Sequence, residues 1–407
     1  MARELGKRRT IPSLHQSRAV AACESATANS ESRDMALLPL VSFFLCCASL
    51  ATLAQSAFAT EFLVGTYTKP GGSHGIYHFH LDAESGKVTG GELVGEASNP
   101  SFITFRAGEK FLYSVNENDK GSVSAFSVGS DWHLTAINKQ PSKGAYPCHI
   151  LVDNTGKTAF ASNYGTGNVV VLPIHEDGSL GEISQNEQFK GSGAVKDRQS
   201  EPHAHSVYLD ATQTYAYACD LGTDWIHGYR FDAAKGTITA DEKASFRVPA
   251  GSGPRHLAFH PQKDFVYCIN EINNTVSGLK RNPADGSLSL LQTISTLPAD
   301  FKGFDTTAEI AVHPNGKFLY SSNRGHDSIA VMAIADDGQL SLVEIVSTGG
   351  KAPRNFAIDP SGKWFLAANM DSNDFFVFKL DERSGKITPT GQRIELPSPV
   401  CVLFSTK

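Results

Sequence analysis

Arginine, histidine and glutamate occur together in the segment GPRHLAFHPQKDFVYCINE, which contains Arg255, His256 and Glu271. A guanidinium group binds a carboxylate or phosphate through two parallel hydrogen bonds. A nearby histidine or glutamate can act as a general base, while the arginine polarises a carbonyl and stabilises a developing oxyanion. Such a set suits the hydrolysis or formation of a lactone, provided that the fold brings the three residues together.

Two other interpretations stay open for these side chains. Arg255 and Glu271 could simply form an ion pair within one sheet. His203 and His205, with the distant His149 and Glu309, could bind a metal, but their spacing is not diagnostic of any metal site. We therefore expect neither a metal nor a cofactor. The sequence contains no Gly-x-Ser-x-Gly motif, so a serine nucleophile is not indicated.

A repeated unit must position these residues. Each copy has a proline or small residue, a short apolar strand, a turn such as PNGK, and a second strand ending in polar residues. Alternating runs joined by Asp-Gly turns follow, which is typical of hairpins. Four short strands in each unit of this length predict a β-propeller. Six complete copies begin at Pro100, Pro147, Pro202, Pro254, Ala308 and Pro353, between 45 (353 − 308) and 55 (202 − 147) residues apart.

The seventh copy is split between the two ends of the chain. The segment SPVCVLFSTK, with Pro399, supplies one strand, and the segment that starts at Glu61 supplies the other three. Joining the two ends would remove the exposed sheet edges of an open array. We therefore predict an all-β fold, a seven-bladed β-propeller with four antiparallel strands per blade, over residues 60–407.

The predicted topology gathers charged residues at one end of the propeller axis. In each blade the first strand begins, and the second strand ends, at the same end of the sheet. We call the residues at these positions the mouth. Asparagines that recur at the second-strand ends are expected to be structural caps, as are His260 and His313 in turns at the opposite end. The candidate functional residues at the mouth are His149, His203, Arg255, His256, Glu271, Glu309, Arg324 and Arg354.

The quoted segment, together with AEIAVHPNGKFLYSSNRGHDSI, EPHAHSV and APRNFAIDPSGKWFLAANM, resembles the seven-bladed propeller lactonases. That family includes 6-phosphogluconolactonases and carboxy-muconate cyclases, and the resemblance covers roughly Glu61 to Lys407. It implies metal-independent hydrolysis of a small anionic sugar lactone. The alternatives are a lactone-forming cycloisomerase and a non-catalytic exported propeller that binds a ligand.

The resemblance also assigns roles to the mouth. Its implied catalytic residues are His203, Arg255, Glu271 and Arg324. Of these, Glu271 or His203 would be the general base or acid, and the two arginines would hold the carbonyl and an anionic group. The remaining substrate-binding candidates are His149, His256, Glu309 and Arg354.

Residues 1–59 have the character of a leader and signal peptide. An apolar run from Ala36 to about Leu53 is followed by Ala57-Phe58-Ala59, which predicts cleavage near Ala59. A membrane anchor at the same run is the alternative, but we expect no stable anchor. The protein is thus predicted to be exported, either periplasmic or secreted. Sugar phosphates are scarce there, which disfavours a phosphorylated substrate.

Charge and cysteine content limit the partners. The net charge of the whole chain is −6, which gives no basic surface for nucleic acid. Without residues 1–59, 30 Lys and Arg stand against 38 Asp and Glu, a net charge of −8. We expect a monomer. The cysteines Cys148, Cys219, Cys268 and Cys401 lie in apolar runs and are expected to be buried free thiols.

Overall fold

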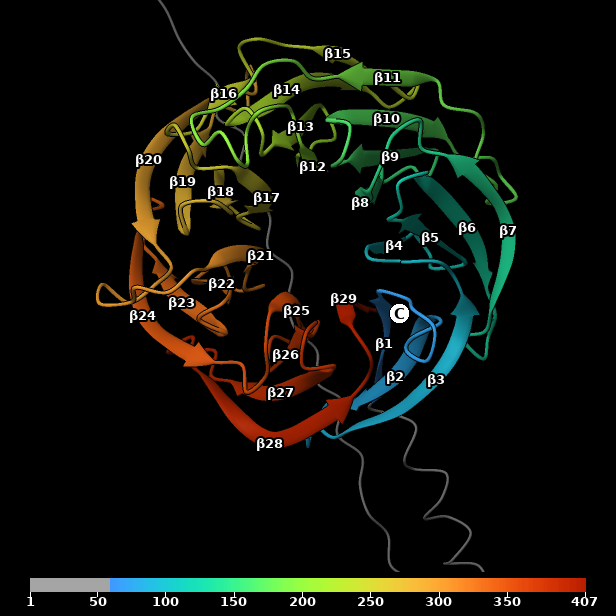
Figure 1. The fold of residues 1–407 in the computed structure, drawn as a ribbon, viewed down its shortest axis with the longest axis vertical. Helices are drawn as coiled ribbons and strands as arrows, with labels where there is room; N and C mark the ends of the chain where they lie inside the picture. The colour runs from blue at the N-terminus through green and yellow to red at the C-terminus, as the bar shows by residue number, and fades with distance from the viewer. Residues whose placement is uncertain (1–58) are drawn as a thin grey trace, which may run out of the picture. The chain divides into compact units, whose positions relative to one another are not determined.

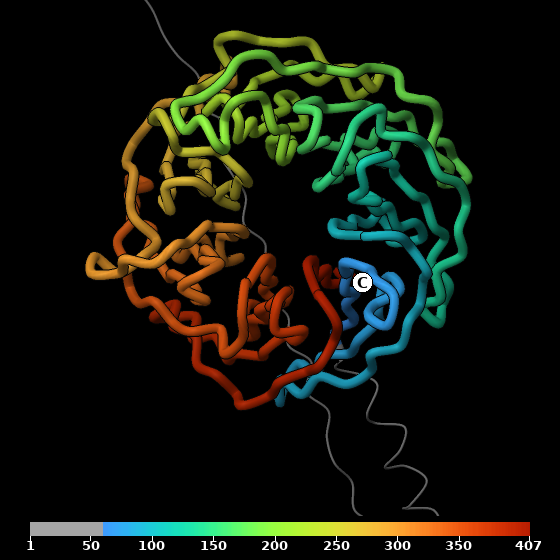
Figure 2. The backbone as a smooth tube through the Cα atoms, in the orientation of Figure 1, coloured from blue at the N-terminus to red at the C-terminus, as the bar shows by residue number. Residues whose placement is uncertain are grey.

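Seven antiparallel sheets form a closed ring in the computed structural model, which describes residues 59–407 (Figures 1 and 2). This confirms the predicted seven-bladed propeller. Within the described range no helix is long and apolar enough to span a membrane. The signal peptide and the alternative anchor, predicted within residues 1–59, lie outside the described residues except for Ala59, where the first strand starts.

We number blades 1 to 6 in chain order, and the split blade is blade 7. Their innermost strands are β4 (Ile103–Phe105), β8 (Pro147–Val152), β12 (Ala204–Leu209), β17 (Pro254–Phe259), β21 (Thr306–Val312), β25 (Pro353–Ile358) and β29 (Pro399–Phe404). The second strands are β5 (Phe111–Asn116), β9 (Thr158–Asn163), β13 (Tyr215–Asp220), β18 (Phe265–Asn270), β22 (Phe318–Arg324), β26 (Trp364–Asn369) and β1 (Ala59–Thr66).

The third strands are β6 (Ser122–Val128), β10 (Asn168–Pro173), β14 (Trp225–Asp232), β19 (Thr275–Arg281), β23 (Ser328–Ile334), β27 (Asp374–Leu380) and β2 (Gly75–Asp82). The outermost strands are β7 (Leu134–Pro141), β11 (Gln185–Gln188), β15 (Thr237–Ala240), β20 (Leu288–Ser295), β24 (Leu340–Ser347), β28 (Ile387–Glu395) and β3 (Val88–Glu96). A short additional strand, β16 (Phe246–Arg247), pairs with β14 in blade 3.

Blade 7 closes the ring as predicted, because β29 pairs with β1 in an antiparallel register that sets Phe62 opposite Phe404 (Figure 1). Side chains of blade 1 also hold the C-terminal residues. The Glu109 carboxylate accepts hydrogen bonds from the Ser405 hydroxyl (2.6 Å) and the Thr406 amide (2.6 Å). The closure therefore combines strand pairing with a buried carboxylate from the neighbouring blade.

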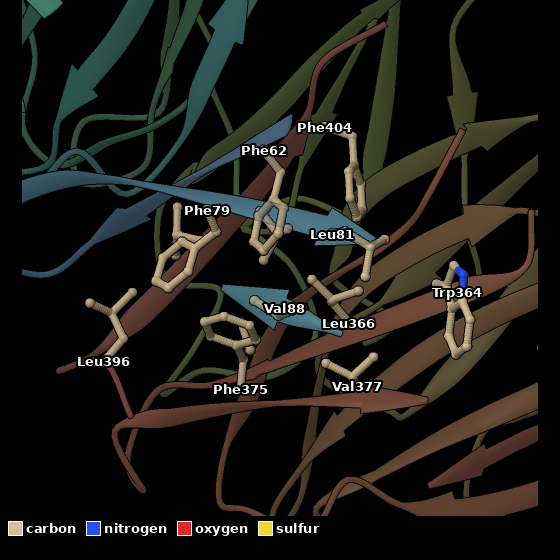
Figure 3. Packing of buried hydrophobic residues seen from close by; sticks show 13 residues of the cluster. Phe62, Phe79, Leu81, Val88, Trp364, Leu366, Phe375, Val377, Leu396 and Phe404 are labelled. Carbon is tan, nitrogen blue, oxygen red and sulfur yellow. The ribbon is translucent and has the colours of Figure 1, made fainter. Parts of the chain in front are cut away.

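Apolar side chains fill the space between neighbouring blades, because every sheet is covered on both faces. Between blades 7 and 6, Phe62 and Phe79 pack against Phe375 and Leu366 (Figure 3). The rings of Phe79 and Phe375 meet edge to face at 5.2 Å between centroids, an arrangement favoured by the aromatic quadrupole. This two-sided burial explains why the inner strands are nearly continuous apolar runs.

A tyrosine of one blade is tied to a glycine turn of the next blade at four places. In blade 5 the Tyr320 hydroxyl, buried in β22, donates to the Gly385 carbonyl of blade 6 at 2.7 Å. The same glycine has φ of 73°, and its Cα lies so close to the Phe318 ring that there is no space for a side chain. The equivalent tyrosine–glycine pairs are Tyr113–Gly178, Tyr217–Gly286 and Tyr267–Gly338. Hence these glycines are required for packing as well as for turn geometry.

Replacing Gly385 with alanine is expected to destabilise the propeller by about 2–4 kcal/mol, because overpacking and a positive φ both oppose the new methyl group. Its Cβ would lie 2.3 Å from the Phe318 ring. Gly391→Ala is the matched control, since Gly391 has φ of 82° but nothing within 4 Å of a new Cβ. Chemical denaturation gives the free energy of unfolding of both variants, and the difference between the two losses is the contribution of packing at Gly385. Equal losses would show that backbone strain alone requires the glycine.

Candidate active site at the propeller mouth

The inner strands of six blades share a β-bulge where each strand begins at the mouth. In blade 4, Pro254 pairs with Asn270 and His256 with Ile269, so Arg255 is the extra residue of the bulge. A bulge redirects a side chain that regular pleating would aim elsewhere. The residues at these bulges are Cys148, His205, Arg255, Ala308 with Glu309, Arg354 and Val400. The repeated irregularity thus supplies several of the charged side chains at the mouth.

Three arginines surround the Glu271 carboxylate. Arg255 Nε lies 3.0 Å and Arg324 Nη2 2.9 Å from Glu271 Oε2. Arg198 Nη2 lies 2.5 Å from the other oxygen, Oε1. Arg255 also donates to the Ala308 carbonyl at 2.7 Å, and Arg324 to the Thr307 carbonyl at 2.7 Å. The ion-pair interpretation of Arg255 and Glu271 is therefore confirmed, and it extends to a four-residue cluster from three segments of the chain.

Burial and charge act in opposite directions on this cluster. Burial alone would raise the pKa of Glu271, but the charges of Arg324, Arg255 and Arg198 lower it to about 2. Burial lowers the pKa of Arg324 to about 10, against the attraction of Glu271. Glu271 and Arg324 are consequently ionised at neutral pH, and Glu271 is a very weak base.

A fourth arginine lies beside a second carboxylate at the same mouth. Arg354 Nη2 is 3.5 Å from Glu117 Oε2, and its guanidinium lies 5.3 Å from the centroid of the Tyr67 ring. Glu117 also accepts hydrogen bonds from the Tyr67 hydroxyl (2.8 Å) and from Ser101. These contacts fix Arg354 while leaving its side chain 13% exposed.

Beneath the arginines, His256 and Glu309 form a buried pair. His256 Nδ1 is 3.0 Å from Glu309 Oε1, and Asn355 Nδ2 donates to Glu309 Oε2 at 2.6 Å. Burial would raise the pKa of Glu309, but the neighbouring His256 and Arg255 lower it. The carboxylate therefore orients the imidazole through Nδ1. Arg255 Nη1 lies against the same ring, 3.3 Å from Nε2, and so joins this pair to the arginine cluster.

Two further histidines complete this buried layer. The ring of His256 lies 5.5 Å from that of His149 and 5.0 Å from that of His205, measured between centroids. Burial, together with the charge of Arg255 and with His256, lowers the pKa of both His149 and His205 well below the usual value. Burial also lowers the pKa of His256. The three rings are therefore neutral at physiological pH and add no positive charge.

His203 lies just before β12 and is only partly buried. Its Nδ1 is 2.9 Å from the Tyr164 carbonyl oxygen, and its ring stacks on Tyr164 at 4.5 Å between centroids. A carbonyl oxygen can only accept, so Nδ1 carries the proton and the lone pair of the neutral ring is on Nε2. Tyr164 also lies edge-on to His205, 5.7 Å away, and connects His203 to the buried layer.

Exposure divides the mouth residues into two groups. Arg255, Glu271, His149, His256 and Glu309 are each less than 10% exposed. The side chains that reach the surface include those of Arg198 (33%), Arg324 (14%) and Arg354 (13%), together with His203. The partly exposed residues can touch a ligand directly. The buried residues hold the partly exposed residues in position. The partly exposed charged side chains at the mouth include three arginines, Arg198, Arg324 and Arg354, against the carboxylate of Glu117, which favours an anionic ligand.

Arg198 was missed by the sequence analysis. It lies in the long connection between β11 and β12, which is the reason for the largest spacing between repeats, 55 residues. Because the outermost strand of a blade ends at the mouth, the unusual length of this connection is the signal that could have drawn attention to Arg198. The connection is itself held by Gln199, whose side-chain amide donates to the Asp224 carboxylate at 2.7 Å.

Asparagines at second-strand ends and the histidines in the opposite turns form hydrogen bonds with the backbone, as expected for structural residues. Asn163 donates to the Ser142 carbonyl at 3.0 Å, and Asn323 to that of Thr296 at 3.0 Å. His313 donates through Nε2 to the Gly362 carbonyl at 2.9 Å, while His260 Nδ1 accepts from backbone amides. The four described cysteines are buried free thiols, as predicted: Cys148, Cys219, Cys268 and Cys401.

Comparison with known proteins agrees with this architecture. The family described as "Lactonase, 7-bladed beta-propeller" matches residues 61–404. A 6-phosphogluconolactonase of Bacillus subtilis is 37% identical over 344 residues, which are 84% of this chain and 97% of the relative. A 6-phosphogluconolactonase of Formosa agariphila is 34% identical over 81% of this chain and 95% of its own. The solved structure of a periplasmic gluconolactonase of Pseudomonas aeruginosa has a TM-score of 0.81 and 33% identity, covering 86% of this chain and 99% of that one.

Proposed function

The chain belongs to the seven-bladed β-propeller lactonases and is a lactonase that hydrolyses a sugar lactone, and from this premise we propose that hydrolysis occurs at the arginine-rich mouth. The observation that carries the proposal is that three partly exposed arginines gather at the mouth: Arg198 and Arg324 on the buried Glu271, and Arg354 on the partly buried Glu117. These guanidinium groups suit a substrate whose carbonyl oxygen becomes negative during reaction.

In the proposed reaction the oxygen of a water molecule attacks the lactone carbonyl carbon. His203 Nε2 takes the proton from that water, since the Tyr164 carbonyl holds the other ring proton on Nδ1. Arg324 stabilises the oxyanion of the tetrahedral intermediate. The ring C–O bond then breaks, and the leaving alkoxide receives the proton from His203. The new carboxylic acid releases its remaining proton to solvent, and the product is a hydroxy acid whose carboxylate is balanced by Arg324 and Arg354.

Glu271 is assigned a positioning role in this scheme rather than the role of base. A carboxylate whose pKa is about 2 and which three arginines contact has little tendency to take a proton near neutral pH. Arg255 is likewise a positioning residue, because it is 2% exposed and its Nε and Nη1 are engaged with Glu271 and Ala308. His149, His256 and Glu309 would support these groups from below.

His203→Gln is expected to lower kcat by about 10²–10⁴-fold, the usual contribution of a general base. Glutamine keeps a similar size but cannot accept the proton. The loss is expected in kcat more than in KM, because the variant can still bind the lactone but lacks the group that takes the proton. His175→Gln, at an exposed turn, is the matched control. If His203→Gln retains the kcat of the original chain, another group is the base.

We further propose that the protein is exported and acts on the lactone outside the cytoplasm. The predicted leader over residues 1–59 supports this, and so does the likeness to a periplasmic gluconolactonase. Fractionation of cells that express the full chain tests it, with N-terminal sequencing of the exported form expected to begin near Thr60. Recovery of the intact chain in the cytoplasm alone would contradict the proposal.

A further inference from the structure

A second cluster of ionisable side chains lies in blade 7, at the end of the propeller opposite the mouth. Glu61 lies near the start of β1, and His78 and His80 lie toward the end of β2. His78 Nε2 is 2.6 Å and His80 Nδ1 is 2.7 Å from the same oxygen, Glu61 Oε2. The cluster therefore brings two imidazole nitrogens and one carboxylate to a single point.

Strand pairing explains this convergence. Glu61 is directly opposite His80 in the β1–β2 register, and residues two apart on a strand share one face, which places His78 beside them. Glu92 of β3 is opposite His78 in the next register. Four potential ligands thus occupy one face of one sheet, and a rigid sheet holds them with little loss of conformational entropy on binding.

The neighbouring blade shapes the surroundings of the cluster. The indole ring of Trp132, from the β6–β7 turn of blade 1, stacks on His78 with 5.0 Å between centroids. His78 is 6% exposed, whereas His80 is 41% exposed and faces solvent. A pocket of about 420 Å³ lies here, lined by the cluster with Glu92, Asp131 and Trp132. One imidazole is therefore fixed by packing, and there is room for a water molecule as an additional ligand.

We propose that Glu61, His78 and His80 form a binding site for one divalent transition-metal ion, best suited to zinc. Two imidazoles, a carboxylate and a fourth position for water or Glu92 match the donors that zinc takes in tetrahedral sites. Calcium and magnesium prefer oxygen ligands only, so the two histidines disfavour them. The ligand atoms already lie within 4.8 Å of one another, and bonds of about 2.0–2.1 Å would require only small side-chain movements.

Such an ion would act on the stability of blade 7 and not on the chemistry at the mouth. It would connect β1, which begins the described chain, to β2 in the blade that both termini complete. Binding to the folded state alone stabilises it by mass action. The site is independent of the proposed function, since it shares no residue with the mouth. It differs from the metal set considered from the sequence, His149, His203, His205 and Glu309.

Isothermal titration of the full chain with zinc, after removal of metals by a chelator, tests the proposal. Equivalents bound are compared among the original chain, His80→Gln and His74→Gln, the last being an exposed histidine of the same blade. We expect His80→Gln to bind one equivalent fewer than the other two. With zinc at about a hundredfold excess over its Kd, thermal unfolding should shift upward by about 3–4 °C in the original chain and in His74→Gln only.

A cobalt-substituted sample supplies a second readout, because tetrahedral nitrogen and oxygen coordination gives a visible absorption band that depends on the ligands. That band is expected in the original chain and absent from His80→Gln. Equal zinc stoichiometry in all three proteins would overturn the proposal. So would a thermal shift of the same size with calcium or magnesium.

Discussion

Replacing Glu271 with glutamine is expected to lower the free energy of unfolding by about 3–5 kcal/mol, because it leaves buried arginine charges without their counter-charge. Three guanidinium groups lie within 3.0 Å of this carboxylate. Glutamine has nearly the same shape, so the loss reports on charge and not on volume. The same variant should lose at least about a hundredfold in kcat/KM, since Arg198 and Arg324 would no longer be held in position.

Glu395→Gln is the matched control, because Glu395 is 81% exposed and lies 3.6 Å from the partly exposed Arg393. Its effect on stability should be below about 0.5 kcal/mol. Urea unfolding and lactone kinetics on both variants give the comparison. A Glu271→Gln protein as stable and as active as the original chain would mean that the arginine cluster does not depend on this carboxylate.

The contribution of Glu271 to the free energy of unfolding is expected to depend on pH. The pKa of Glu271 is depressed to about 2 in the folded chain, compared with its ordinary value of 4.5. The unfolded state therefore binds the proton more readily, and the contribution of Glu271 to stability is complete above about pH 4.5 and is lost as pH falls toward 2. The stability difference between the original chain and Glu271→Gln should narrow over this window.

Replacing Arg324 with methionine is expected to lower kcat by about 10²–10³-fold, the usual loss when one oxyanion donor is removed. Arg324 combines an ion pair with Glu271 and a partly exposed side chain, so it can reach both the protein and a ligand. Arg324→Lys keeps the charge but not the planar pair of donors and should recover only part of the rate. The lost rate should appear in kcat more than in KM, because the interaction strengthens in the transition state.

Arg383→Met, at an exposed turn at the other end of the propeller, is the control for loss of an arginine. It should leave both kinetic constants unchanged. Circular dichroism on each variant establishes that the fold is retained. Equal activity of Arg324→Met and the original chain would remove Arg324 from the proposed mechanism.

The blade plan could be predicted from sequence because its signals are local and repeated. Alternating apolar runs recur in each copy, with proline at most first-strand starts and Asp-Gly turns in three copies, and the split copy required only a count of strands. The mouth followed from topology, since Arg255 and Glu271 belong to adjacent ends of β17 and β18. The strand pattern of a copy and the closeness of Arg255 to Glu271 can each be inferred from residues of one blade.

Contacts between blades could not be predicted in this way. The bulge at Arg255 depends on how β17 pairs with β18 and packs beside its neighbours, and no residue type announces it. Arg198 reaches Glu271 from a loop 73 positions away in the chain. The partition of the mouth into exposed and buried layers arises from packing around the whole ring. The resemblance offered Glu271 as a possible base because its contacts with arginines from other segments could not be seen in the sequence. Those contacts lower the pKa of Glu271 and make it a very weak base.

The central claim is tested most directly by the initial rate of hydrolysis of a six-carbon sugar lactone, with and without a 6-phosphate, compared between the original chain and Arg324→Met. The account predicts that the original chain hydrolyses at least one of the two lactones far above the spontaneous rate, and that Arg324→Met, folded to the same extent, loses at least about a hundredfold of that activity. A rate with the original chain no greater than in buffer would contradict the assignment as a lactonase, and full activity in Arg324→Met would contradict the location of the site.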